Sequence, residues 1–228
     1  IYASEGSDPA VSLLFGLKTI GRTFFLLTRE GERYAICTVI DAQESEDSGL
    51  FDQVLRYQGE PDETLKQLVE RLNPAQIALN FSVDDNMCDG LTTGRYRYLR
   101  RALGAETAAR FISSQPMLQR LRAVKTSKEI AAMRHAIDIT DAIYNEVFAQ
   151  IRPGMTERDV GQLFLDGMSR RGVVMSFTRT LSMPIIMKER IAHREPGDAV
   201  LQGGDFLIID FGVLVGGYSS DFSRTAYV

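Results

Sequence analysis

The two strand-like stretches at the end of the sequence constrain the fold of this chain more than any other feature. Residues 206–213 follow a Gly203-Gly204-Asp205 turn and carry apolar side chains on both faces, which is typical of a strand buried on both sides. Gly216-Gly217 supplies turn residues, and residues 218–228 then form the pattern of a returning strand. The sequence therefore predicts a β-hairpin in the interior of a domain.

The expected register of this hairpin brings two acidic side chains together. If the turn is centred between Val215 and Gly216, Asp210 pairs with Asp221, and directly opposed side chains share a face with Cβ atoms about 5 Å apart. Two carboxylates that close in a buried sheet repel each other and are costly to desolvate. A shared proton, a pair of basic side chains or a divalent cation would compensate. Arg224 is expected on the opposite face, so metal is the simplest compensation.

Asp210 and Asp221 are therefore the candidate metal ligands. Carboxylate oxygens favour Mn²⁺ or a similar cation over a structural Zn²⁺. Two such ions can generate a hydroxide and polarise a carbonyl, which is hydrolytic chemistry. The alternative is a solvent-facing strand without metal, and a one-residue bulge would also separate the pair. His193, in a loop before the hairpin, is a candidate to bind substrate or transfer a proton, with a plain surface histidine as its alternative.

Two amphipathic helices precede the hairpin. Residues 126–129 have the sequence of a capping box, and apolar residues then recur at a 3–4 spacing until Arg152-Pro153-Gly154 ends the helix. Thr156 begins a second helix, which Gly172 ends. Such helices need an apolar surface to cover, and the hairpin that follows is the natural partner.

The N-terminal part of the chain alternates strand-like and helix-like stretches, which predicts a small α/β domain. We expect strands at 12–16, 23–27, 33–40 and 76–80, and helices at 62–72 and 91–103. The pattern changes after residue 118, so the predicted domains are 1–118 and 119–228. The first of these carries no catalytic constellation.

Composition limits the classes of function. Charged residues make up 25% of the chain and its net charge is −4, so nothing suggests a nucleic-acid partner. No apolar run approaches the ~18–20 residues that cross a bilayer. Cys37 and Cys88 lack metal-ligand spacing and predict two buried free thiols in a reducing cytoplasm. The chain begins without Met and stops within a strand pattern, so both ends look cut, and any leader would lie outside the sequence.

These segments resemble a known family, the pita-bread metallopeptidases: aminopeptidase P, prolidase, methionine aminopeptidase and the metal-free relative creatinase. Residues 204–212 and 217–225 look like the strand pair that carries the family's first two metal ligands. Residues 124–130 and 151–157 look like the start of the catalytic domain and the link between its first helices. The resemblance is specific from about residue 119 onward. Before that, it is the general look of the N-terminal domain of the proline-specific members.

The resemblance implies an α/β (α+β) fold, with a creatinase-like N-terminal α/β domain followed by a partial pita-bread catalytic domain. It implies two divalent metal ions, Mn²⁺ first and Co²⁺ or Zn²⁺ as alternatives, held by Asp210, Asp221, and then a His and two Glu. It also gives His193 a substrate-binding, proton-handling role. The later ligands have no counterpart before the sequence ends at Val228, so the fragment alone is expected to bind metal weakly and to be inactive.

The function implied is that of an Xaa-Pro aminopeptidase or Xaa-Pro dipeptidase. Such an enzyme hydrolyses the bond before proline in a peptide substrate, and the resemblance suggests a homodimer. An N-terminal domain favours these enzymes over methionine aminopeptidases. Two alternatives stay open: a non-catalytic peptide- or protein-binding module on the same fold, and a creatinase-like C–N hydrolase. Retention of both aspartates disfavours each of them.

Overall fold

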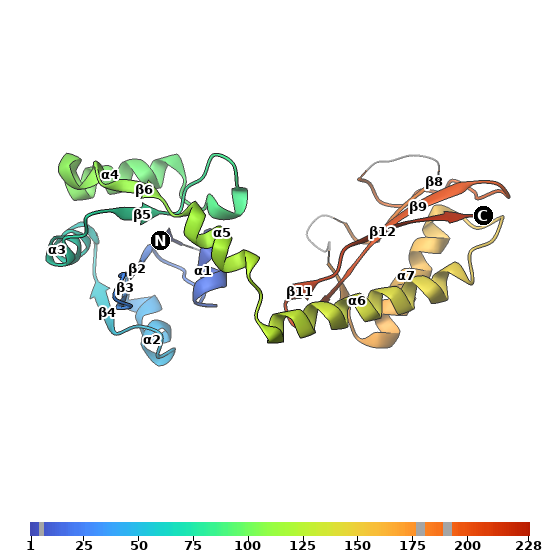
Figure 1. Ribbon diagram of the computed structural model, residues 1–228, viewed down its shortest axis with the longest axis horizontal. Coiled ribbons are helices and arrows are strands. Elements are labelled where there is room, and N and C mark those ends of the chain that lie inside the picture. The colour runs from blue at the N-terminus through green and yellow to red at the C-terminus, as the bar shows by residue number, and fades with distance from the viewer. Residues whose placement is uncertain (5–6, 177–180, 189–192) are drawn as a thin grey trace. The chain divides into compact units, whose positions relative to one another are not determined.

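The chain forms two compact units, residues 1–124 and 125–228 (Figure 1). Each unit has a hydrophobic core made only of its own residues. No helix within the described residues has the length and apolarity that a transmembrane span requires. The computed structural model describes residues 1–4, 7–176, 181–188 and 193–228.

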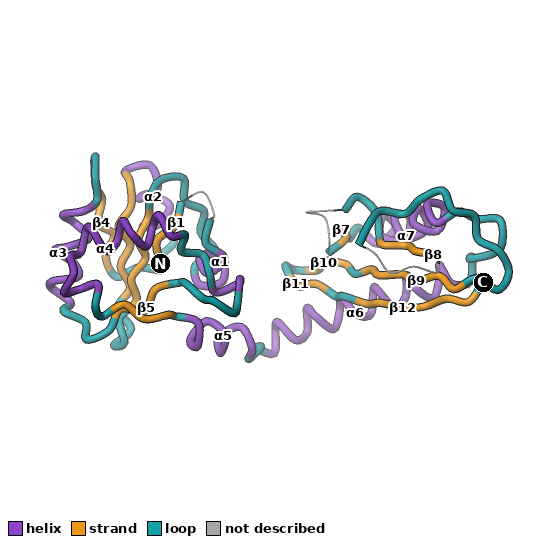
Figure 2. Tube along the Cα trace, turned by 90° about the horizontal axis from the view of Figure 1, so that it is seen from above, coloured by secondary structure: helices purple, strands orange, loops and turns teal. Residues whose placement is uncertain are grey.

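The first unit contains a four-stranded mixed sheet of order β1-β2-β3-β4 and a two-stranded parallel sheet, β5-β6 (Figure 2). Strands β2 and β3 form an antiparallel hairpin, whereas β4 runs parallel to β3. The elements are β1 (Tyr2–Ala3), α1 (Pro9–Leu14), β2 (Thr23–Leu27), β3 (Arg33–Thr38), α2 (Val39–Asp47), β4 (Gln53–Tyr57), α3 (Asp62–Leu72), β5 (Ile77–Leu79), η1 (Asn86–Cys88), α4 (Thr93–Ala108), β6 (Phe111–Ser113) and α5 (Gln115–Ala123).

Most elements predicted for this unit are confirmed, and two predictions are wrong. The predicted strand at 12–16 falls largely in helix α1, because the Asp8 side chain caps that helix by accepting a hydrogen bond from a backbone amide. The predicted strand over 33–40 ends at Thr38, whose side chain caps α2 in the same way. In both places a short polar side chain satisfies the helix terminus and outweighs the β-propensity of the apolar residues that follow.

Both cysteines lie inside the first unit. Cys37 in β3 and Cys88 in η1 are free and fully buried, which confirms the prediction of two buried thiols. Burial raises the pKa of each thiol, since the thiolate loses its hydration. Neither thiol is therefore activated as a nucleophile.

The second unit packs two antiparallel helices against one face of an antiparallel sheet (Figure 1). Both helices begin with a capping box, at Thr126 and Thr156, and Gly172 ends the second, as the sequence predicts. The elements are α6 (Ser127–Phe148), α7 (Glu157–Arg171), β7 (Val174–Met175), β8 (Ile185–Lys188), β9 (Phe206–Phe211), β10 (Val213–Val215), β11 (Tyr218–Ser219) and β12 (Phe222–Tyr227). The strand orders are β12-β9-β8 and β11-β10-β7.

The core of this unit lies between the helices and the sheet. Phe164 of α7 and Phe211 of β9 are both fully buried, with 4.7 Å between their ring centroids. The Tyr144 hydroxyl of α6 lies within hydrogen-bond distance of the carbonyl oxygens of Ile209 (3.1 Å) and Phe222 (2.8 Å). Tyr144 thus ties α6 to both strands of the hairpin.

The predicted hairpin is present, but its register differs from the prediction. Asp210 pairs with Ser223 and not with Asp221. The turn is centred between Gly216 and Gly217, whose φ angles of 56° and 84° suit the two positive-φ positions of a tight hairpin turn. The centre of pairing therefore lies one residue further along, and the two aspartates become diagonal neighbours.

The expectation of a strand buried on both faces is also wrong for β9. Leu207, Ile209 and Phe211 are fully buried under the helices, whereas Ile208 and Asp210 are only partly buried. Helices α6 and α7 cover one face of the sheet, and the described residues leave the other face of β9 partly open. The aspartates lie on this half-open face.

Candidate metal centre

Asp210 and Asp221 share one face of the hairpin. Because Asp210 pairs with Ser223, Asp221 is displaced from it by two residues on the neighbouring strand, and such diagonal positions lie roughly 7–8 Å apart. Asp210 is partly buried and Asp221 is exposed. The register prediction was wrong in detail, but a shift of two positions keeps both side chains on the same face.

Gly212 lies directly opposite Asp221, one residue beyond the Phe211–Phe222 pair. A Cβ atom at position 212 would lie 2.0 Å from the carbonyl oxygen of Ser220 and 2.8 Å from the hydroxyl of Ser176. The strands therefore approach each other more closely at this point than any side chain permits.

Buried hydroxyl groups fix the backbone just before Asp221. The hydroxyl oxygens of Thr140 on α6 and Ser220 lie 2.6 Å apart, and both side chains are buried. The Val213 amide donates to the Ser220 hydroxyl over 2.9 Å. Ser220 thus links helix α6 to both strands of the hairpin, and this fixes the position of the next residue, Asp221.

The electrostatics of Asp210 suit a cation. Burial raises the pKa of this carboxyl, the neighbouring Asp221 carboxylate raises it further, and His193 acts in the opposite direction. The Oδ1 atom of Asp210 is buried and has no hydrogen-bond partner among the described residues. A buried acceptor without a partner is uncommon, and a bound cation would supply the missing interaction. The pair therefore fits a divalent metal ion.

The described residues contain no group of three or more His, Cys, Asp or Glu side chains that could hold a metal. Asp210 and Asp221 are thus a pair of oxygen donors and not a complete ligand set. Oxygen donors suit hard cations such as Mn²⁺. A divalent cation held there would act as a Lewis acid toward a substrate carbonyl.

His193 lies in the segment between β8 and β9, and its side chain is exposed. Its positive charge works to lower the pKa of Asp210, against the larger effects of burial and of Asp221. All three residues singled out from the sequence lie in the second unit, and the hairpin brings two of them, Asp210 and Asp221, onto one face. Their catalytic roles stay predictions.

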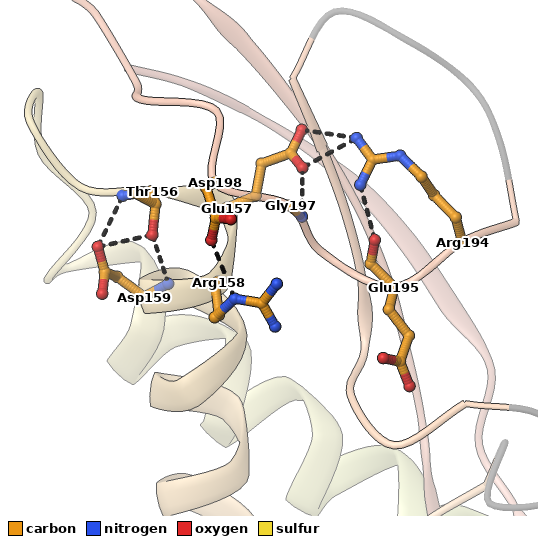
Figure 3. A network of polar contacts seen from close by, with 8 residues as sticks. All are labelled: Thr156, Glu157, Arg158, Asp159, Arg194, Glu195, Gly197 and Asp198. Carbon is orange, nitrogen blue, oxygen red and sulfur yellow. Dashed lines mark hydrogen bonds and ion pairs between the residues drawn. The ribbon is translucent and has the colours of Figure 1, made fainter.

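Sequence reasoning missed Glu157, the first residue of α7. Its side chain is only 1% exposed, and it accepts hydrogen bonds from the backbone amides of Lys188 and Gly197, each at 2.8 Å, and from the Arg194 guanidinium at 2.9 Å (Figure 3). Desolvation raises the pKa of Glu157, but these donors outweigh it and hold the pKa below its usual range. An acidic residue in the first turn of a helix is a common sequence feature, so its position alone gave no signal.

Comparison with known proteins bears on the same part of the chain. Residues 131–228 match the model of metallopeptidase family M24. This part of the chain is similar to family M24. The family match covers the helices α6 and α7, the hairpin and all three candidate site residues. It agrees with the resemblance drawn from the sequence of the two strands.

Curated relatives extend the similarity into the first unit. An Xaa-Pro dipeptidase of Lactobacillus delbrueckii subsp. lactis is 25% identical over 201 residues, which cover 86% of this chain and 52% of the relative. A Bacillus subtilis protein with a provisional dipeptidase name is 27% identical over 201 residues, with the same coverage of 86% and 52%. The chain therefore spans about half the length of these relatives.

Solved structures agree on the fold. An X-Pro aminopeptidase from Thermotoga maritima has a TM-score of 0.69 and 25% identity, and the match covers 100% of this chain and 61% of that structure. An Xaa-Pro dipeptidase from Bacillus anthracis has a TM-score of 0.72 at 22% identity, covering 99% and 59%. The fold is thus α/β with part of a pita-bread domain, as the sequence predicts.

Proposed function

We propose that this protein is an Xaa-Pro aminopeptidase or Xaa-Pro dipeptidase, a metal-dependent hydrolase that cleaves the peptide bond before proline. The observation that carries the proposal is the aspartate pair: Asp210 and Asp221 lie on one face of a family M24 hairpin, and a buried carboxylate oxygen lacks a partner. The names of the relatives, which include Xaa-Pro dipeptidases and an X-Pro aminopeptidase, support the substrate class.

In this proposal, Asp210 and Asp221 hold metal, with Mn²⁺ as the native ion. His193 contacts the substrate and holds or moves a proton beside Asp210. Residues 1–124 are the N-terminal domain of a proline-specific member, and the active form is a cytoplasmic homodimer. The half-open face of β9 is what makes the site accessible, since a peptide must reach carboxylates that the helices do not cover.

The test compares Asp210→Ala with a matched control, Asp166→Ala, in the intact gene product. Asp166 is an exposed residue of α7 whose carboxylate accepts a hydrogen bond from Gln162 of the same helix. Mn²⁺ content and Xaa-Pro peptide hydrolysis are measured for both. We expect Asp210→Ala to lose bound Mn²⁺ and at least about 100-fold of the activity, whereas the control keeps both.

Full activity of the Asp210→Ala variant would contradict the proposed role of Asp210 as a metal ligand. A gene product that binds no Mn²⁺, Co²⁺ or Zn²⁺ and cleaves no Xaa-Pro peptide would instead favour the non-catalytic binding module. Circular dichroism of each variant shows whether the fold is kept, so that loss of activity is not confused with unfolding.

A further inference from the structure

The segment that carries His193 is tied to the rest of the second unit by two carboxylates. Glu157, at the start of α7, accepts from the Arg194 guanidinium and from the Gly197 amide. Glu195 accepts from the Ser182 amide over 2.7 Å and from its hydroxyl. The residues directly after His193, from 194 to 197, are therefore fixed at several points, although they belong to no helix or strand.

Arg194 transmits this restraint to the residue beside it. One guanidinium nitrogen donates to both carboxylate oxygens of Glu157, at 2.9 and 3.2 Å, and another donates to the carbonyl oxygen of Glu195 over 2.6 Å (Figure 3). Both ends of the Arg194 side chain are thus held, its Cα by the chain and its guanidinium by Glu157. The planar guanidinium accepts few geometries in such a network, so the backbone next to His193 has little freedom.

Stability alone does not explain a carboxylate this deeply buried. Removing a charge from water costs several kcal/mol, and well-packed apolar residues are often as stabilising as a buried ion pair. Glu157 has four donor contacts, from two backbone amides and two Arg194 bonds, so its charge is fully compensated. Compared with apolar packing, the ion pair adds a defined geometry, because directional hydrogen bonds fix the position of residues 194–197 and apolar contacts do not.

We infer that Glu157 is a positioning residue for the proposed site: through Arg194 it fixes the backbone that carries His193. This rests on the proposed function for the role of His193. The positioning itself depends only on the hydrogen bonds between Glu157, Arg194 and Gly197. Glu157 touches neither substrate nor metal in this proposal, and it acts through its neighbours.

The test measures whether the NMR signals of the His193 imidazole change when Asp210 is substituted, and whether this change requires Glu157. The sequence has two histidines, so a His135→Gln background leaves the imidazole signals of His193 alone in the NMR spectrum. The change in these signals on Asp210→Asn, at one fixed pH, is measured with Glu157 and again with Glu157→Gln. We expect Glu157→Gln to reduce that change by at least about half, because the segment loses its fixed position.

Two further variants complete the design. Glu146→Gln removes the charge of another glutamate of the same unit, which pairs with Arg170 and Arg171 between α6 and α7. In that control the response to Asp210→Asn should be unchanged. Arg194→Lys keeps a positive charge but loses the planar fork, and it gives a second route to the same result if Glu157→Gln fails to fold.

The outcomes separate the two proposals. A full response of His193 in the Glu157→Gln and Arg194→Lys variants would overturn the inference, as would no response in the chain with Glu157 intact. If the His193 response is reduced in Glu157→Gln but the intact gene product cleaves no Xaa-Pro peptide, the positioning role is kept and only the proposed function is contradicted. A reduced response in the Glu146→Gln control as well would show general loosening, which also contradicts the inference.

Discussion

At Gly212, a hydrogen atom occupies the place where any other residue would press a side chain against a backbone carbonyl. The Cβ of Gly212→Ala would lie 2.0 Å from the Ser220 oxygen, far inside van der Waals contact. Neither strand can move freely, since Ser220 is bonded to Thr140 and to Val213. We expect Gly212→Ala to lower the free energy of unfolding by about 1–3 kcal/mol or more, measured by urea denaturation through NMR signals of residues 125–228.

Gly203→Ala is the matched control for this prediction. A Cβ at Gly203 meets no atom within 4 Å, and its φ is not positive. Its effect should stay within about 0.5 kcal/mol. Equal effects of the two substitutions would show that loss of chain flexibility matters more than the clash at Gly212.

Also at the residue scale, local spacing in the sequence was enough to predict that the two candidate metal ligands share one face. Asp210 and Asp221 stand on neighbouring strands of a single hairpin, so a turn and a period of two were enough to place them on one face. Glu157 was out of reach, because its partners Arg194 and Gly197 are 37 and 40 residues away in the chain. Spacing rules describe neighbours along an element and contain no term for such long-range contacts.

At the scale of single elements, the N-terminus of α7 should make stability depend on pH. The pKa of Glu157 is held below its unfolded value of 4.5, so the folded state binds its proton less readily than the unfolded chain does. The stabilisation from this carboxylate is therefore complete above about pH 5 and is lost as the pH falls below 4.5 through the folded pKa. Glu157→Gln has no proton to bind at this position.

We therefore expect the difference in unfolding free energy between Glu157 and Glu157→Gln to be largest at neutral pH and to shrink on acidification. Urea denaturation of both forms from pH 7 to pH 3, followed on the second unit, measures it. A difference that stays constant over this range would mean that Glu157 contributes through its shape and not through its charge.

Elements with strong end signals were the ones that the sequence predicted well. The capping box at Thr126 and the start signal at Thr156 placed the beginnings of α6 and α7, since the groups that form each cap lie within four residues of one another. The prediction of the hairpin register was wrong because the two glycines allow the turn to be centred on either side of Gly216. The positive φ angles of both Gly216 and Gly217 show which of these two turn positions is formed. The prediction that β9 is buried on both faces was wrong because burial depends on which face the helices cover.

At the scale of the whole molecule, the two cores should unfold independently. The core of residues 125–228 includes Phe164, and a core of residues 1–124 includes Phe25; both side chains are fully buried. Phe164→Ala and Phe25→Ala should each cost about 3–5 kcal/mol, but only in their own unit. Hydrogen exchange of backbone amides separates the two effects, and faster exchange throughout the chain in either variant would contradict independence.

The buried thiols divide the molecule for an experimenter in the same way. Cys37 and Cys88 are the two cysteines of the sequence, and both lie in residues 1–124. A thiol-specific reagent can react only when that unit opens, because both sulfur atoms are fully buried. The rate of labelling thus reports the opening of the first unit alone, and residues 125–228 can be mutated or denatured without exposing any further thiol.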